Sequence, residues 1–131
     1  MFLQIDARNG LAVYDQIVRQ VKFAVADGAL TTGELVPSVR ELARELAINP
    51  NTVARAYRQL QDDGVLDAVR GTGLAVAAAA RRPCQAERTR LIRARLRQVL
   101  EEAALSGLDP QEIEQLVRAE STAARRGKQR G

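Results

Sequence analysis

Residues 33–73 begin with Gly33-Glu-Leu-Val-Pro-Ser38-Val-Arg40-Glu-Leu-Ala, continue with Ile48-Asn-Pro-Asn-Thr-Val-Ala-Arg55-Ala-Tyr57, and end with Gly64-Val-Leu and Arg70-Gly-Thr-Gly73. This order predicts a capped helix, a short turn, a second capped helix with a polar face, and a glycine-tipped basic hairpin. A helix-turn-helix followed by such a hairpin, or wing, reads duplex DNA. The stretch therefore predicts a winged helix-turn-helix.

The capping residues of this stretch define two helix starts. Ser38 is the expected N-cap of one helix, and Glu41 three residues later completes the pattern of a capping box. Asn49 is the expected N-cap of the next helix, with Pro50 at its first position, where the missing N–H would have no partner anyway. Residues 47–48 form the turn between the two helices.

The rest of the chain adds one helix before this stretch and two after it. Apolar residues at helical spacing predict a helix over residues 13–27, stopped by Gly28. Residues 65–69 and 74–78 are the expected strands of the wing. Residues 81–83 are expected to form a hinge, followed by a helix over residues 85–105 and a last helix that starts after the N-cap Asp109.

The predicted fold is mostly α. An N-terminal winged helix-turn-helix, with three helices and a two-stranded β-wing, precedes a two-helix C-terminal dimerisation region. We expect the DNA-binding domain over residues 1–80 and the helical region, with any effector site, over residues 81–124. The basic tail, residues 125–131, has no apolar content and is expected to be disordered.

The two C-terminal helices are too small to enclose a core of their own. Their apolar stripes are therefore expected to pack on a second copy of the chain. This dimer would place two DNA-binding domains side by side. The residues predicted to form this dimer contact are Leu91, Ile92, Leu96, Val99, Leu100, Ala103, Ile113, Leu116 and Val117.

The residue inventory argues against catalysis. The chain has no histidine and one cysteine, which excludes Ser-His and Cys-His relays and every histidine metal site. We expect no metal, no cofactor and no enzymatic activity. The single Cys84, the absence of a signal-peptide pattern and the shortness of the apolar run 75–80 favour a cytoplasmic protein with no membrane partner.

The second capped helix carries the strongest candidate site. Its face opposite Val53 and Tyr57 bears Asn51, Thr52, Arg55 and Arg58. Asn pairs bidentately with adenine, Arg pairs with guanine, and Thr contacts phosphate or a thymine methyl. The alternative is an ordinary solvated helix face, and the surrounding motif favours DNA contact. The net charge of +4 favours nucleic acid only weakly.

Further candidate contacts flank this helix. Ser38 and Arg40 begin the helix that crosses the DNA backbone in this architecture, although Arg40 has Glu41 and Glu45 as competing partners. The wing offers Arg70 to a narrow minor groove, or is a plain hairpin with one exposed arginine. The predicted DNA-binding residues are Ser38, Arg40, Asn49, Asn51, Thr52, Arg55, Arg58, Arg70, Gly71, Thr72 and Gly73.

The N-terminal half resembles the GntR family of bacterial winged-helix transcription regulators. Its first signature is carried by Gly28-Ala-Leu-Thr-Thr-Gly33-Glu-Leu-Val-Pro-Ser-Val-Arg40-Glu-Leu-Ala, and the rest by Asn51-Thr-Val53, Gly64-Val-Leu and Arg70-Gly-Thr-Gly73. Residues 48–57, followed by a C-terminal part of only about fifty residues, are similar to the YtrA subfamily.

The resemblance implies a homodimeric repressor of an operon, often transporter-related, that binds a palindromic double-stranded DNA operator through Arg40, Asn51, Thr52 and the wing glycines. A small-molecule effector held at the dimer interface and a ligand-free regulator are both open. The chain departs from the family pattern at Val36 in place of leucine, at Ala54 in place of arginine, and at residues 74–75 in place of Thr-Phe.

A second functional class is a protein-interaction module that uses the winged helix without binding specific DNA. The polar face of the second capped helix argues against it, because a partner groove would require apolar anchors there.

Overall fold

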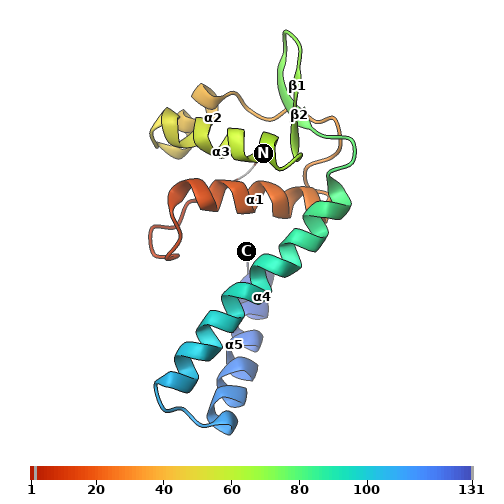
Figure 1. Ribbon diagram of the computed structural model, residues 1–131. Coiled ribbons are helices and arrows are strands. Elements are labelled where there is room, and N and C mark those ends of the chain that lie inside the picture. The colour runs from red at the N-terminus through yellow and green to blue at the C-terminus, as the bar shows by residue number, and fades with distance from the viewer. Residues whose placement is uncertain (2, 131) are drawn as a thin grey trace. The chain divides into compact units, whose positions relative to one another are not determined.

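The computed structural model describes residues 1 and 3–130, with side chains up to residue 127. It divides into two compact units, Met1–Arg90 and a second that begins at Leu91. The N-terminal unit holds α1 (Val13–Asp27), α2 (Val39–Leu46), α3 (Pro50–Asp62), β1 (Leu66–Val69) and β2 (Gly73–Val76) (Figure 1). Helix α4 (Arg81–Leu105) begins in this unit and ends in the other, which also holds α5 (Pro110–Arg130). The predicted mostly α winged helix-turn-helix is confirmed.

The core of the N-terminal unit lies where α3 packs against α1 on one side and α2 on the other. The apolar stripes of the three helices meet there, and Ile17, Leu42, Val53 and Leu60 are completely buried. Because water-excluded aliphatic side chains stabilise the fold in proportion to the apolar area that they bury, this contact fixes α3 as a rigid support for its opposite face.

The helix starts agree with the capping residues. Helix α1 has the predicted range and ends at Gly28, whose φ of 87° is left-handed. In α2 the Ser38 Oγ accepts the Glu41 N–H at 3.1 Å and the Glu41 carboxylate accepts the Ser38 N–H at 3.2 Å, which confirms the capping box. Asn49 caps α3, with Pro50 at its first position.

The wing is an antiparallel hairpin that projects from the helices (Figure 1). Leu66 pairs with Val76 and Val69 with Gly73, so both strands are slightly shorter than predicted. Residues 33–36 run along the free edge of β2: the Gly33 N–H donates to the Val76 carbonyl at 2.8 Å and the Val36 N–H to the Leu74 carbonyl at 3.0 Å. This pairing was not predicted, since residues 31–37 have no strand alternation.

The hinge predicted over residues 81–83 is wrong. Helix α4 begins at Arg81, and the Cys84 N–H donates to the Ala80 carbonyl at 3.0 Å. Pro83 lies in the first turn, where proline is tolerated because its missing N–H needs no partner inside the helix. The compact unit extends to Arg90, ten residues beyond the predicted boundary at residue 80, because Cys84 is buried in the core.

The disordered tail predicted from residue 125 is also wrong as far as residue 130. Helix α5 continues to Arg130, while Gly131 lies outside the described residues. Residues 125–130 include three arginines, one lysine and one glutamine, which are good helix formers. A segment without apolar residues can therefore extend a helix that has already been nucleated.

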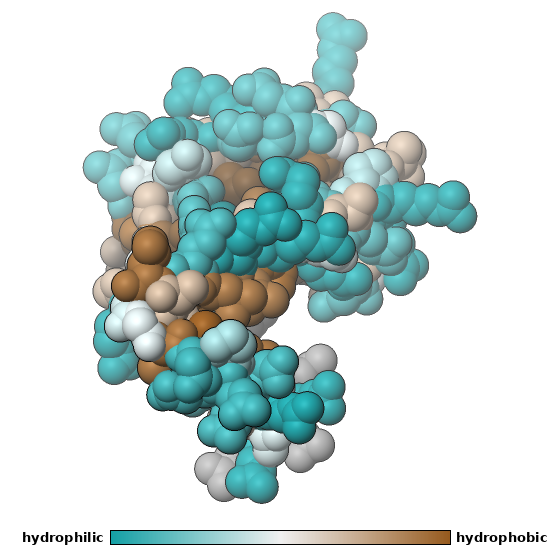
Figure 2. Space-filling model, turned by 60° about the horizontal axis from the view of Figure 1, so that its bottom comes forward, coloured by the Kyte–Doolittle hydropathy of each residue, from teal (hydrophilic) through white to brown (hydrophobic). Residues whose placement is uncertain are grey.

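Apolar side chains of the C-terminal unit remain partly uncovered. Figure 2 shows apolar side chains gathered in one area of a face that is otherwise mostly hydrophilic. In this unit Leu91, Leu100, Ala103 and Ile113 are partly buried. The exposed fractions of the other predicted dimer residues run from 41% to 56%, for Ile92, Leu96, Val99, Leu116 and Val117. The C-terminal unit by itself does not bury these stripes.

Candidate nucleic-acid interface

Helix α3 presents a polar face opposite the core. Val53, Ala56, Tyr57 and Leu60 are buried on one side. The predicted contact residues lie on the other: Asn51, Arg55 and Arg58 are exposed, and Thr52 is partly buried. Amide, hydroxyl and guanidinium groups of this kind supply the donors and acceptors that match base edges and phosphate oxygens.

The first turn of α3 uses Asn49 as its cap. The Asn49 Oδ1 accepts the N–H of Asn51 at 2.8 Å, which satisfies one of the orphan donors of the helix start. The side-chain oxygen of Asn49 is therefore engaged within the chain, while the side chain of Asn51 is exposed.

Arg55 has an aromatic partner that was not predicted. Its Cζ lies 3.8 Å from the centroid of the Tyr14 ring, in the first turn of α1. An arginine over the face of a tyrosine is held by a cation–π attraction. The two residues are far apart in the sequence, so no local pattern could have indicated the contact.

Arg40 lies in the first turn of α2 and is exposed. Within the described part of the chain, no carboxylate oxygen lies within 4.0 Å of its guanidinium. The expected competitor Glu41 is engaged by the cap, and the hydrogen bonds from the Ser38 backbone and side chain hold the pKa of the Glu41 carboxyl below its usual value. Arg40 is therefore available to an external anion.

The tip of the wing consists of Arg70, Gly71 and Thr72, all exposed. The Thr72 N–H donates to the Val69 carbonyl at 2.9 Å, which closes the turn. Gly71 has a φ of 76°, a left-handed conformation that favours glycine over residues with a Cβ. The turn thus holds one arginine at the end of a narrow hairpin.

Tyr57 is a structural residue on the core side of α3, opposite the polar face. Its side chain is 3% exposed, and its hydroxyl donates a 2.7 Å hydrogen bond to the carbonyl of Pro37. Burial, followed by the nearby Glu45 and Glu41 carboxylates, raises the pKa of the Tyr57 phenol. The bond ties α3 to the segment that precedes α2.

These candidate residues come from three elements that meet in the N-terminal unit. Helix α3 contacts both α2 and β1, and Figure 1 shows the hairpin projecting beside these helices. No hydrogen bond or ion pair joins the side chain of Arg40, Arg58 or Arg70 to another described residue. The structure therefore assembles a set of unneutralised arginines around the polar face of α3.

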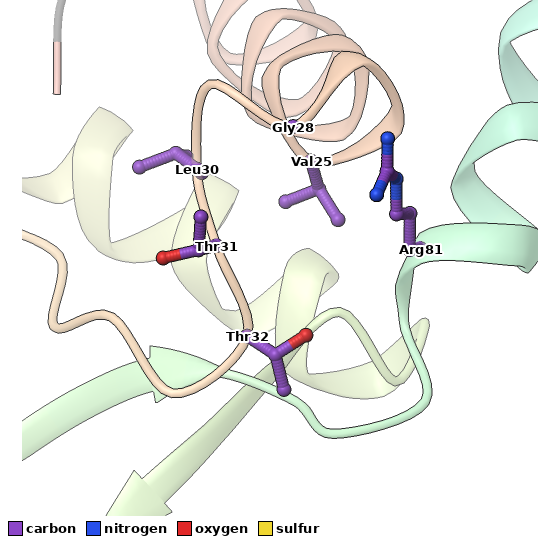
Figure 3. Close-up of a pocket in the computed structure, with 6 residues that line it drawn as sticks. All are labelled: Val25, Gly28, Leu30, Thr31, Thr32 and Arg81. Carbon is purple, nitrogen blue, oxygen red and sulfur yellow. The ribbon is translucent and has the colours of Figure 1, made fainter.

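A small pocket lies away from this face, where α1 ends and α4 begins. Its volume is about 280 Å³, and Figure 3 shows the Arg81 side chain extending beside Gly28. The Thr31 hydroxyl on its wall is engaged by the Glu34 carboxylate at 3.2 Å. The pocket is lined by Val25, Gly28, Leu30, Thr31, Thr32 and Arg81.

The described residues offer neither a metal site nor a membrane-spanning helix. None of their Cys, Asp and Glu side chains form a group of three or more that could hold a metal ion. Over the same residues, no helix is long and apolar enough to cross a bilayer. Burial raises the pKa of the Cys84 thiol, the opposite of what a reactive thiolate requires.

Comparisons with known proteins agree with this architecture. The family model described as "Bacterial regulatory proteins, gntR family" matches residues 13–76, which run from the start of α1 to the end of β2. The "HTH-type transcriptional repressor YtrA" of Bacillus subtilis (strain 168) is 31% identical over 126 residues, which cover 96% of this chain and 97% of that protein.

Solved structures show the same likeness over both units. A "GntR family transcriptional regulator from Listeria monocytogenes" is 28% identical with a TM-score of 0.67, covering 88% of this chain and 98% of that one. "YtrA from Sulfolobus acidocaldarius, a GntR-family transcription factor" is 30% identical with a TM-score of 0.57, covering 77% and 99%. The chain therefore belongs to the GntR family of bacterial transcriptional regulators, with the predicted YtrA-like character, and is a regulatory protein rather than an enzyme.

Proposed function

We propose that this regulator is a cytoplasmic, homodimeric repressor that binds a palindromic double-stranded DNA operator. The observation that carries the proposal is the exposed polar face of α3, with Asn51 and Arg58 opposite a fully buried apolar stripe. A helix held rigidly from behind, with amide and guanidinium groups in front, matches the requirements of major-groove reading.

The contacts divide by the element that supplies them. Helix α3 is assigned to base edges through Asn51, Thr52, Arg55 and Arg58. Arg40, near the free N–H groups at the start of α2, is assigned to phosphate. Arg70 at the wing tip is assigned to the backbone or to a narrow minor groove.

Dimerisation supplies the symmetry of the operator. The uncovered apolar side chains of α4 and α5 would be buried between two copies, and a two-fold dimer matches an operator with two half-sites. The relative from Bacillus subtilis is named a repressor, which supports repression as the mode of action.

The test is selection of bound duplexes from a randomised pool by the purified full chain, followed by footprinting on the recovered sequence. The proposal expects a symmetric motif with two half-sites. Recovery of unrelated sequences without a footprint would contradict the proposal. Stable capture of a partner protein by the α3 face would instead favour a protein-interaction module.

A further inference from the structure

The contact between Arg55 and Tyr14 links the polar face of α3 to a helix that has no other assigned role in DNA reading. The Arg55 Cζ lies 3.8 Å from the Tyr14 ring centroid, while Arg55 itself remains exposed. Tyr14 is partly buried and packs against the hydrophobic core. One side of this contact is thus anchored, and the other faces solvent.

The anchor is rigid. Tyr14 lies in the first turn of α1, two residues before Gln16, whose side chain is 2% exposed. The Gln16 amide accepts the Asp6 N–H at 2.9 Å and donates to the carbonyls of Asp6 at 2.9 Å and Leu11 at 3.0 Å. These bonds fasten the first turns of α1, which carry Tyr14, to the loop before them, and the Tyr14 side chain packs against the core.

The orientation of Arg55 is set by this ring rather than by an acid. Within the described part of the chain, no carboxylate lies within 4.0 Å of the Arg55 guanidinium. A guanidinium that stacks through its flat face keeps its N–H donors at the edges of the plane. Those donors remain available for a phosphate or for a guanine edge.

We propose that Tyr14 is a positioning residue for DNA recognition, because its ring holds the Arg55 guanidinium in the orientation in which it meets the DNA. This proposal rests on the proposed function. An arginine that is already ordered loses less side-chain freedom on binding than one that is free in solvent. Removing the ring therefore weakens binding even though Tyr14 itself does not touch the DNA.

The test is a double-mutant cycle on a duplex recovered by selection. Dissociation constants are measured at one salt concentration for wild type, Tyr14→Leu, Arg55→Ala and the double variant. An exposed cation–π contact corresponds to about a two- to fivefold change in affinity per half-site. Tyr14→Leu should weaken binding by that factor when Arg55 is present and have no effect when it is alanine.

Two further variants separate positioning from a loss of stability. Tyr14→Phe keeps the aromatic face and should restore binding, whereas Phe23→Leu removes a ring elsewhere on α1 and should leave binding unchanged. Thermal melting of each variant checks that it is folded. If Tyr14→Leu does not fold, Tyr14→Met replaces it, because methionine fills space in the same place without an aromatic face, and it should weaken binding by a similar factor.

The outcomes separate this inference from the function on which it rests. Equal weakening by Tyr14→Leu in both Arg55 backgrounds, or wild-type affinity in Tyr14→Leu or in its replacement Tyr14→Met, would overturn the positioning role alone. A wild-type chain that binds no duplex at all would overturn the proposed function together with it.

Discussion

The Lys22 ammonium lies 2.7 Å from the Asp63 carboxylate, which joins α1 to the residue that ends α3. The Lys22 side chain is 10% exposed, and the Glu87 carboxylate of α4 lies 3.9 Å from the same ammonium. Three helices of the N-terminal unit therefore converge on one nearly buried cation. This contact holds the far end of α3, while the Arg55–Tyr14 contact holds the face near its start.

Lys22→Met should destabilise the N-terminal unit by about 1–3 kcal/mol, because it keeps the apolar stem but leaves Asp63 without its cation. The cost stays below that of a fully buried pair, since Asp63 and Glu87 retain some contact with water. The loss of unfolding free energy in Lys22→Met is measured by urea unfolding. Arg8→Ala, which breaks an exposed pair with Asp6 at 4.0 Å, is the control and should change stability by less than about 0.5 kcal/mol. If Lys22→Met and Arg8→Ala lower the unfolding free energy by the same amount, Lys22 has no special role in stability.

Glu41 should make the fold sensitive to acid. Its hydrogen bonds with Ser38 lower the pKa of the carboxyl from the usual 4.5. The folded-state pKa lies below the unfolded one, so this group stabilises the fold above pH 4.5, and the contribution is lost as the pH falls through the folded-state pKa. The melting temperatures of wild type and Glu41→Gln should therefore differ more at neutral pH than in acid.

Glu45→Gln is the charge-matched control for that comparison, because it removes a carboxylate from the same helix without touching the capping box. The same pH dependence in both variants would show that the cap is not responsible.

Ala47 carries backbone strain in the turn between α2 and α3. Its φ of 54° is left-handed, a conformation that costs an alanine about 1–2 kcal/mol. Glycine removes this cost but gains freedom in the unfolded chain, so Ala47→Gly should stabilise the fold by about 0.5–1 kcal/mol. Ala54→Gly, inside α3, should instead destabilise it by about 1 kcal/mol. Destabilisation by both glycines would contradict the strain at Ala47.

Local patterns in the sequence predicted the three helices of the winged helix-turn-helix closely. The range of α1, the capping box at Ser38 and the Asn49-Pro50 start of α3 depend on neighbouring residues, so the sequence alone was enough. The same reasoning failed at residues 81–83. There a basic pair before proline suggested a hinge, but the first turn of a helix accepts proline.

The long-range contacts that hold α3 in place could not be predicted from local patterns. Lys22 meets Asp63 across 41 residues, and Arg55 meets Tyr14 across two helices. Both contacts depend on how α1 packs against α3, which hydrophobic periodicity does not specify. The pairing of residues 33–36 with β2 depends likewise on where the hairpin folds back.

Dimerisation should depend on the exposed apolar stripe of α4 and α5. Leu96 is 48% exposed in a single copy, and Leu96→Glu would place a charge in the contact. Sedimentation at micromolar concentration should show a dimer for wild type and a monomer for this variant. Ala94→Glu, at an exposed position on the opposite side of α4, should remain dimeric. A monomeric wild type, with or without DNA, would contradict the proposed assembly.

The most direct test of DNA reading by α3 is the ratio of affinities for a selected duplex and for a scrambled duplex of the same composition. Wild type should prefer the selected duplex by roughly a thousandfold or more, and its affinity for both should fall as salt rises. Arg55→Ala should cost about 1–3 kcal/mol on the selected duplex and shrink the ratio, whereas Arg40→Ala should weaken both duplexes alike. Equal wild-type affinity for the two duplexes would contradict the account.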